Sequence, residues 1–238
     1  MLAMKATVVD IPRKRIKRFM PVVKWMNAGA RQMPLYWHKR DTADGVEVVS
    51  DWKHPLCRKL RVVYNVYKDG SLGIDLYVHP KGIDAVRVGL QLVLPRGFDN
   101  IKWYGRGPNE CYPDRKTGAR ISIFSAAVED IGHRYIRPQE NGARCDVRWL
   151  SVSSGVRSLF VKDLSGEGLI FSAWHYEQSE LATASHDHEL IRKPFTTLNI
   201  DSAMCGVGGD LPGIASLHRE YKLPGNKEYR LRVELELR

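Results

Sequence analysis

A Gly- and Pro-rich stretch at 103–116, WYGRGPNECYPDRK, concentrates side chains that could act on a ligand. Glu110 and Asp114, next to the cation of Arg115, fit either a carboxylate pair for acid–base catalysis or an ion network that holds a loop. Because glycine and proline interrupt regular structure here, a spacing of four residues does not fix the distance between the two carboxylates. The pattern favours a loop network, with Arg106 and Glu110 as candidate ligand-binding groups.

A second stretch of mixed charge lies at 135–150 and reads YIRPQENGARCDVRWL. Arg137, Glu140 and Asn141 lie on and beside its Pro-x-x-Asn-Gly turn. Arginine–carboxylate forks fix the geometry of such a loop, and the same groups can hydrogen-bond the hydroxyls of a sugar. The pattern favours a structural role in the loop over ligand binding. These three residues are nevertheless candidates for a sugar-facing cleft.

Histidines are concentrated in a third stretch, WHYEQSELATASHDHEL at 174–190. In a strand, His186-x-His188 would place both rings on one face, which is the minimum for a metal pair. No third ligand has a defined spacing, so we expect no metal site. His175 and His186 are candidate acid–base groups, although histidines hydrogen-bonded within the fold are the favoured interpretation.

Two glycine-rich segments match nucleotide-binding loops only in part. Gly105-x-Gly107 lacks the third glycine and the following helix of a dinucleotide fingerprint. The segment 205–213, CGVGGDLPG, lacks the Gly-Lys-Ser/Thr end of a phosphate loop. We therefore expect the protein to use no cofactor.

The elements that must position these residues are predicted to be β-strands. Apolar residues alternate at 72–79 and 86–94. Asp69-Gly70, between the runs at 60–68 and 72–79, is a strong hairpin signal. Closely spaced strands with few helical patterns predict an antiparallel β-sandwich or barrel. A helix is expected within 19–29 and a helical turn at 179–184. The expected strands are 60–68, 72–79, 86–94, 120–124, 144–152, 159–162, 169–174, 197–200, 214–223 and 228–237.

Composition sets limits on the partners and the compartment. The 238-residue chain carries a net charge of +10, but its one dense basic run is at 13–18 and the other basic residues are mixed with acids. This favours no nucleic-acid partner, with binding through the basic run as an alternative. No apolar run is long enough for a membrane span, and the N-terminus is a poor secretory signal. Four widely spaced cysteines predict reduced thiols in a cytoplasmic protein.

Four segments in this order resemble one protein family: WYGRGPNECYPDRK, YIRPQENGARCDVRWL, HDHEL and LNIDSAMCGVGGD. Together they are similar to the C-terminal domain of glycoside hydrolase family 2 β-galactosidases, which also occurs as a separate small chain. The resemblance is clear from about residue 60 to the end, and KWMNAG at 24–29 carries it more faintly.

The resemblance implies an all-β antiparallel supersandwich of the galactose mutarotase-like type at 36–238, after a basic, irregular segment at 1–35. It also implies a non-catalytic domain, because the family cuts the glycosidic bond with two glutamates of a separate barrel. The implied partners are a barrel-containing chain and a galactoside, and a homo-oligomer is a further expectation. The loop of Gly208, Gly209 and Asp210 is expected near the substrate entrance.

Two departures from the family pattern bear on these expectations. The strands that usually precede KWMNAG are missing, so we expect a shortened domain with an open sheet edge. Counted from Gly208-Gly209-Asp210, the position of the tryptophan that follows Gly-Gly-Asp in the family falls at Gly213. Glycine cannot stack on a sugar ring, so either this contact is lost or the loop aligns differently.

Two other functions stay open. The first is a mutarotase-like aldose 1-epimerase that uses Glu140 with His175 or His186. The second is a stand-alone carbohydrate-binding domain with a platform at Trp103, Trp149 or Trp174.

Overall fold

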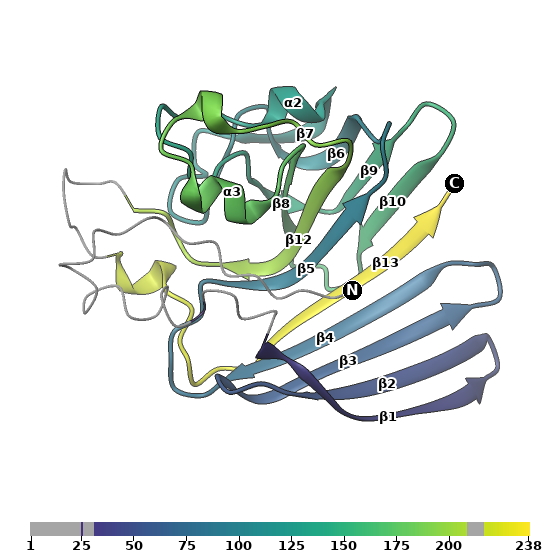
Figure 1. Ribbon diagram of the computed structural model, residues 1–238. Coiled ribbons are helices and arrows are strands. Elements are labelled where there is room, and N and C mark those ends of the chain that lie inside the picture. The colour runs from purple at the N-terminus through teal and green to yellow at the C-terminus, as the bar shows by residue number, and fades with distance from the viewer. Residues whose placement is uncertain (1–24, 26–30, 209–216) are drawn as a thin grey trace.

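The protein forms two antiparallel β-sheets, seen in Figure 1. The structure is a computed structural model that describes Trp25 and residues 31–208 and 217–238. The basic run at 13–18 and most of the expected helix at 19–29 lie outside the described residues. The all-β antiparallel class expected from the sequence is confirmed.

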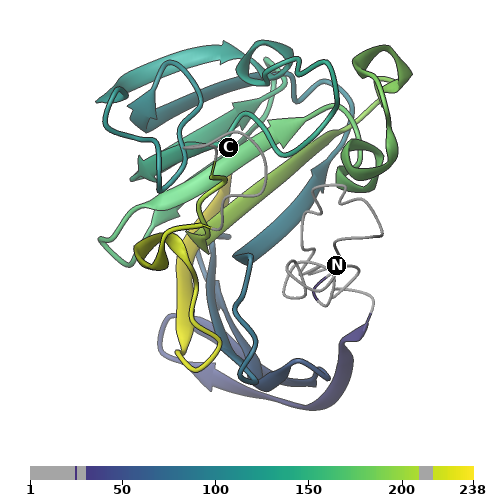
Figure 2. The same cartoon turned by 90° about the vertical axis from the view of Figure 1, so that its left-hand side faces the viewer.

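The larger sheet has nine strands. Figure 2 shows its first four strands, violet to blue, in the lower half of the molecule and its teal strands in the upper half. In spatial order the strands are β1 (Met33–Thr42), β2 (Gly45–Lys53), β3 (Cys57–Tyr67), β4 (Leu72–Pro80), β13 (Tyr229–Leu237), β10 (Ser158–Asp163), β9 (Trp149–Ser153), β6 (Asn100–Gly107) and β7 (Arg120–Ala127).

The last strand of the chain lies in the middle of this sheet. β13 pairs with β4 on one side and with β10 on the other, so it joins the first four strands to the rest. Its alternation places Leu231, Val233 and Leu235 in the core, as the period of two predicts. The expected strands 60–68, 72–79 and 228–237 are β3, β4 and β13.

The smaller sheet has four strands, and it packs on the larger one across the hydrophobic core. Its order is β5 (Arg87–Leu94), β12 (Thr196–Met204), β11 (Leu169–Trp174) and β8 (Arg144–Val147). The core between the sheets includes Leu76, Trp103, Phe171 and Ile200, each almost fully buried. The strands expected at 86–94, 169–174 and 197–200 are β5, β11 and the middle of β12.

Short helices occur in the connections. They are α2 (Val128–Ile131), α3 (Gln178–Thr183), η3 (Asp187–Glu189) and η4 (Arg219–Tyr221), and α3 confirms the helical turn expected at 179–184. Figure 1 shows α2 and α3 at the same end of the molecule. Each helix in the described part of the chain is too short or too polar to cross a membrane.

Three sequence-based element predictions are wrong. The strand expected at 144–152 is split between β8 and β9, which belong to different sheets, and Asp146 within β8 has a φ of 53°. In the part of 214–223 that the structure describes, η4 replaces the expected strand. The loop expected from residue 103 begins later, because β6 continues to Gly107.

The sequence also missed β1. All ten of its residues are exposed, including Leu35 and Trp37, so the strand lacks the alternation of buried and exposed positions that marks a strand. β1 pairs only with β2 and forms one edge of the nine-stranded sheet.

Trp25 connects the N-terminal region to the core. Its indole Nε1 donates to the carbonyl oxygen of Asp84 at 2.9 Å. The ring stacks on His54 with 5.7 Å between ring centroids, and both residues are buried. The tryptophan of the KWMNAG segment is therefore part of the folded unit.

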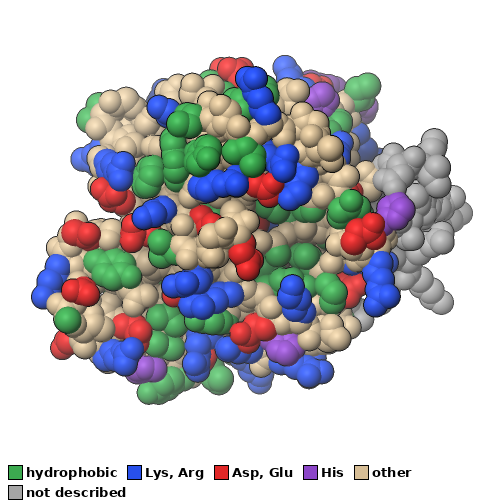
Figure 3. All heavy atoms as spheres, turned by 180° about the vertical axis from the view of Figure 1, so that it is seen from behind, with side chains coloured by type: hydrophobic (Ala, Val, Ile, Leu, Met, Phe, Trp, Pro, Cys, Tyr) green, Lys and Arg blue, Asp and Glu red, His purple; other side chains and the backbone are tan. Residues whose placement is uncertain are grey.

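Acidic and basic side chains are mixed on the face that Figure 3 shows. The described strands of the large sheet carry several cross-strand ion pairs. Arg230 Nη2 and Arg232 Nε lie 2.7 and 3.0 Å from the same carboxylate oxygen of Asp75. Arg61 is paired with Asp51 at 2.7 Å.

Truncating a core leucine of β13 tests its central position. Leu231→Ala removes a fully buried side chain, and we expect it to lower the free energy of unfolding by about 2–5 kcal/mol. Leu237→Ala is the matched control in the same strand, because its side chain is 65% exposed. Urea unfolding followed by tryptophan fluorescence measures both. Similar small losses in the two variants would contradict the central placement of β13.

Candidate functional site

Most of the four-stranded sheet is buried on both faces, which is the physical basis of the candidate site. Along β5, Val88, Leu90 and Leu94 point into the hydrophobic core. Arg87 and Gln91 point to the opposite face and are also buried. A face that is polar and shielded from water must satisfy its hydrogen bonds internally. The loops that cover this face therefore have to bring polar partners.

A buried charge cluster lies at one end of this outer face. Arg87 donates from Nε to the Asp201 carboxylate at 3.2 Å, and its Nη2 also contacts Asp201. Its Nη1 donates to Glu140 Oε2 at 3.2 Å, and the Tyr112 hydroxyl lies 3.5 Å from the other Glu140 oxygen. All four residues are buried. Asp201 approaches so closely that a Cβ on Gly89 would lie 2.3 Å from its Oδ1.

Electrostatics keep the guanidinium of this cluster charged. Burial alone would lower the pKa of Arg87, but the charges of Asp201 and Glu140 outweigh burial and raise this pKa above its ordinary value. Burial raises the pKa of Tyr112 well above its ordinary range, so its hydroxyl stays protonated and can donate to Glu140. The cluster therefore has one cation between two carboxyl groups.

A row of uncharged polar side chains crosses the same face. Gln91 lies directly opposite Asn199, and Asn199 lies opposite Ser172 on the next strand. Gln91 Nε2 donates to Asn199 Oδ1 at 2.9 Å, and Asn199 Nδ2 donates to Ser172 Oγ at 3.2 Å. From α3 above the sheet, Gln178 accepts a hydrogen bond from Gln91 at 3.2 Å. The row connects three strands and the helix that covers them.

Glu110 fastens two covering loops to each other. Its Oε1 accepts from Arg115 at 2.6 Å and from the Tyr135 hydroxyl at 2.5 Å, and its Oε2 accepts from the Gly142 amide at 2.8 Å. Asp114 points elsewhere, because its Oδ2 accepts from the Gly208 amide. The two carboxylates thus have separate partners, which agrees with the loop network favoured from the sequence.

Arg106 belongs to a different cluster, on β6. Its Nε lies 2.5 Å from Asp146 Oδ2, and Lys116 lies 2.9 Å from the other oxygen. Arg106 also donates to the carbonyls of Lys116 and Ala119. The side chain thus ties the loop after β6 to Asp146 of β8.

The other two candidates of the second stretch differ in exposure. Asn141 is buried, accepts from the His133 amide at 3.2 Å and donates to the Gln139 carbonyl at 2.9 Å. Arg137, four residues earlier, is exposed. The structure therefore brings Glu140 into the charge cluster, places Asn141 within the loop fold and leaves Arg137 at the surface.

The glycine-rich loop begins beside the charge cluster. The Gly208 amide donates to Asp114 Oδ2 at 2.7 Å, and Gly208 has a φ of 72°, which favours glycine. A Cβ on Gly206 would lie 2.5 Å from the same carboxylate. Burial raises the pKa of the preceding Cys205 thiol to about 12, with a smaller contribution from Asp114. Gly209 and Asp210 lie outside the described residues.

The histidine candidates have their own partners. The His175 ring is buried, with Nδ1 3.1 Å from the Phe195 carbonyl oxygen and 3.2 Å from Thr196 Oγ1. His186 is exposed and pairs with Glu189. His186 and His188 do not lie in a strand, because Asp187–Glu189 forms the 3-10 helix η3.

Of the three candidate tryptophan platforms, two are in the interior. Trp103 is 1% and Trp174 is 2% exposed, so neither can stack on a ligand. Trp149 lies on β9, facing away from the core, and stacks on Phe160 with 5.7 Å between centroids. Tyr104 lies opposite it on β6.

Sequence reasoning missed the strand residues of the polar face. Arg87, Gln91 and Asn199 lie in segments that were interpreted as core strands, and Asp201 directly follows one of them. The signal was present, because each residue alternates with the apolar positions that were used to predict the strand. The alternation normally assigns such residues to solvent, and only the covering loops turn this face into an interior.

Comparison with known proteins identifies related sequences. Residues 7–235 match the family described as beta galactosidase small chain. A β-galactosidase of Vibrio cholerae is 36% identical over 187 residues, which cover 76% of this chain and 17% of that protein. A β-galactosidase of Enterobacter cloacae is 32% identical over 211 residues, covering 85% of this chain and 20% of that protein. The chain thus spans about a fifth or less of the length of these relatives.

The solved structures that match this chain have lower sequence identity. A galactose mutarotase-like protein from Lactobacillus casei has a TM-score of 0.41 and 13% identity, over 85% of this chain and 73% of that one. A GalM/aldose epimerase homologue from C. elegans has a TM-score of 0.43 and 10% identity, over 90% and 72% of the two chains.

Removing the buried cation tests the charge cluster. Arg87→Met leaves two buried carboxyl groups without their guanidinium, and we expect it to lower the free energy of unfolding by about 3–5 kcal/mol. Arg61→Met is the matched control, because Arg61 and Asp51 form a partly exposed pair for which about 0–1 kcal/mol is expected. Chemical unfolding measures both. Equal losses would show that Arg87 does not hold the cluster together.

A pH-dependent prediction concerns Asp146. Burial alone would raise its pKa, but hydrogen bonds from Arg106 and Lys116 outweigh burial and lower the pKa below its ordinary value. The ionised carboxylate therefore stabilises the fold above its unfolded-state pKa of about 4, and this contribution is lost as pH falls through the lowered folded-state pKa.

Asp146→Asn isolates this charge, because asparagine also tolerates the positive φ at this position. We expect a loss of about 1 kcal/mol in the free energy of unfolding at pH 7, since the site is partly exposed. Urea unfolding at pH 7 and pH 3 measures the difference between wild type and variant. A difference that does not shrink at pH 3 would assign the effect to the side-chain exchange instead of the charge.

Proposed function

This chain belongs to the β-galactosidase small chain family, and on that premise we propose that it is a non-catalytic part of a larger glycoside hydrolase that cleaves terminal β-galactosides. The proposal rests on comparing how much of this chain the family match covers with how much of a whole β-galactosidase this chain covers. The family match extends over nearly the whole chain, whereas the chain corresponds to 17% of the Vibrio cholerae relative. A larger, barrel-containing chain or domain is the proposed partner.

The use of the carboxylates supports a non-catalytic role. A retaining glycosidase needs two carboxyl groups about 5–5.5 Å apart that face the sugar, one as acid and one as nucleophile. Here Glu140 and Asp201 are buried against Arg87. Glu110 is hydrogen-bonded to Arg115, Tyr135 and Gly142. These groups hold the loops of this chain together, which leaves the hydrolytic step to the partner.

We propose that the loop of Gly208, Gly209 and Asp210 is the part of this chain nearest to the galactoside. The Asp114 carboxylate supports this assignment, because it holds the Gly208 amide and fixes where the loop leaves β12. In this proposal the covering loops are held in shape by Glu140, Glu110 and Asn141, which do not themselves contact the sugar. Arg106 and Arg137 are the less central candidates for sugar contact.

The same proposal places the complex in the cytoplasm and in lactose catabolism. The four free cysteine thiols of the chain support a reducing compartment. A homo-oligomeric complex is part of the proposal and rests on the family alone.

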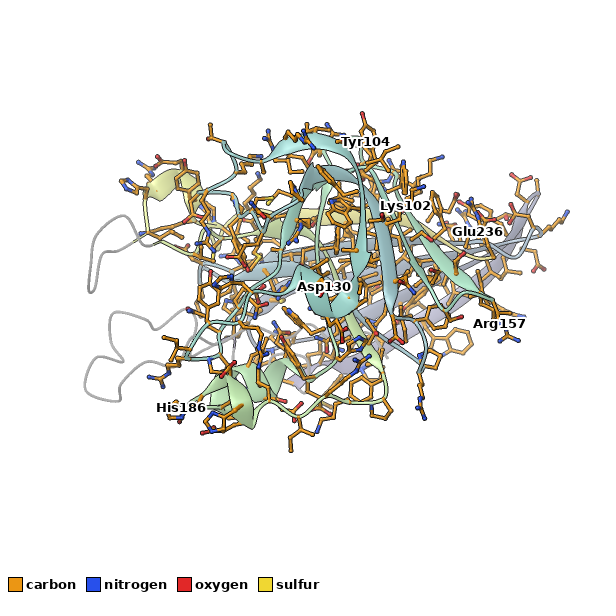
Figure 4. The ribbon with its side chains drawn as sticks, turned by 90° about the horizontal axis from the view of Figure 1, so that it is seen from above. Lys102, Tyr104, Asp130, Arg157, His186 and Glu236 are labelled. Carbon is orange, nitrogen blue, oxygen red and sulfur yellow. The ribbon has the colours of Figure 1, made fainter. Side chains whose placement is uncertain are left out.

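A stand-alone carbohydrate-binding domain is the second candidate. Trp149, Tyr104 and Phe160 favour it, because their rings lie on the outward side of the large sheet, and Tyr104 is 37% exposed. Figure 4 shows Tyr104 beside Lys102 at the outer face. Sugar rings stack on such platforms. The aldose 1-epimerase alternative is less supported, because its proposed base Glu140 is engaged by Arg87.

Complementation tests the main proposal. The segment that corresponds to this chain is deleted from the Vibrio cholerae β-galactosidase, and this chain is then fused in its place or added as a separate polypeptide. We expect no hydrolysis of a chromogenic β-galactoside by this chain alone or by the deleted enzyme, and hydrolysis by the combination. The reason is that the barrel supplies the catalytic groups and this chain completes the site.

A variant distinguishes assembly from shaping of the site. Asp114→Ala releases the Gly208 amide, and we expect the complex to assemble as in wild type, by gel filtration, with lower activity. Hydrolysis by this chain alone would overturn the proposal. Polarimetry of α-galactose and titration with galactose test the alternatives, which require catalysis or binding by the isolated chain.

A further inference from the structure

Three metal-binding side chains meet in one exposed turn that the proposed function does not use. The ligand atoms of His186, His188 and Glu189 all lie within 4.8 Å of one another. The two imidazole rings are stacked, with 5.4 Å between centroids and 20° between planes. His186 Nδ1 lies 3.2 Å from Glu189 Oε1. Among the described residues, this is the one such group of histidine, cysteine or acidic side chains.

The 3-10 helix η3 creates this grouping. Residues three apart eclipse each other in a 3-10 turn, which places Glu189 over His186. The His186 carbonyl accepts from the Glu189 amide at 3.1 Å and closes the turn. The Ser185 amide donates to Glu189 Oε2 at 2.8 Å, which orients the carboxylate with Oε1 toward the imidazole. The third ligand therefore comes from the turn and is not visible in a His-x-His pattern.

The turn is also anchored to the rest of the protein. The Asp187 amide donates to the Ile136 carbonyl at 3.2 Å, and the Asp187 carboxylate pairs with Arg134 at 3.0 Å. These contacts hold η3 against the loop that carries Glu140. The backbone under the three ligands is thus fixed before any ion binds, which lowers the entropic cost of binding.

We propose that His186, His188 and Glu189 form a binding site for a divalent late transition metal such as Zn²⁺. Two imidazoles and one carboxylate match the ligand preference of zinc, with the fourth position open to water. Around a tetrahedral zinc ion, ligand atoms are about 3.4 Å apart. Side-chain rotations that bring the ligand atoms closer by at most about 1.4 Å close the present spacing of up to 4.8 Å. Calcium and magnesium prefer oxygen ligands and fit this site poorly.

The location indicates what the ion would do. Figure 4 shows His186 at the periphery, on the opposite side of the molecule from Tyr104 and Lys102. The turn belongs to the connection between β11 and β12, the same connection in which α3 brings Gln178 onto the polar face of the small sheet. A bound ion would cross-link this connection internally. The site is thus a structural clamp at the surface, independent of the proposed function.

Calorimetric titration of the tag-free chain with ZnCl2 tests the site. We expect one zinc ion per chain, and at least about tenfold weaker binding by His188→Ala and by Glu189→Gln, because each removes a direct ligand. His38→Ala is the control, since His38 is an exposed histidine on β1 next to Tyr36. Circular dichroism establishes that the variants are folded.

A second readout locates the ion. In a nitrogen–carbon correlated NMR spectrum of the histidine side chains, zinc should shift the resonances of His186 and His188 and leave those of His38 unchanged. Zinc binding of equal affinity in His188→Ala, or shifts confined to other histidines, would overturn the proposal. Lack of zinc binding by the wild-type chain at submillimolar zinc would overturn it as well.

Discussion

Arg87 is the cation on which the buried polar layer of this protein depends. An unpaired charge at this depth would cost several kcal/mol. Arg87 therefore needs its two carboxylate partners, and each of them needs Arg87. Asp201 comes from the neighbouring strand, and Glu140 lies 53 residues along the chain in a covering loop. The guanidinium therefore joins β5 to β12 and also docks that loop on the sheet. Glu110 then fastens the loop after β6 to the docked loop through Gly142.

A sheet buried on both faces explains how the charged loops are used. In many sandwiches the outer face of each sheet meets water. Here the outer face of the small sheet is covered, and the residues of the two motif-bearing stretches form that cover. Their charges are directed at one another and at the strands below. This internal use of the charges is consistent with the proposal that the chain shapes a site for a catalytic partner.

The exposed histidine turn differs from the interior in what surrounds its polar groups. The charged groups of the cluster around Arg87 are satisfied by protein partners, whereas the imidazoles of His186 and His188 face solvent with a carboxylate beside them. Both features belong to connections that cover the same sheet. The proposed zinc clamp would stabilise that cover from outside, in the way that Arg87 stabilises it from within.

The sequence by itself determined the strands with a strict period of two, because alternation is a local property of the chain. β4, β5 and β13 are such cases, and four ordered motifs were enough for the family. Tertiary structure decided the rest. β1 is exposed along its whole length and leaves no pattern to detect. Arg87 and Asp201 look like solvent-facing positions until loops from elsewhere cover them. The third ligand beside His186 depends on a 3-10 turn instead of a strand. In each case the deciding contacts come from tertiary packing or from the geometry of a turn, which spacing along the chain does not specify.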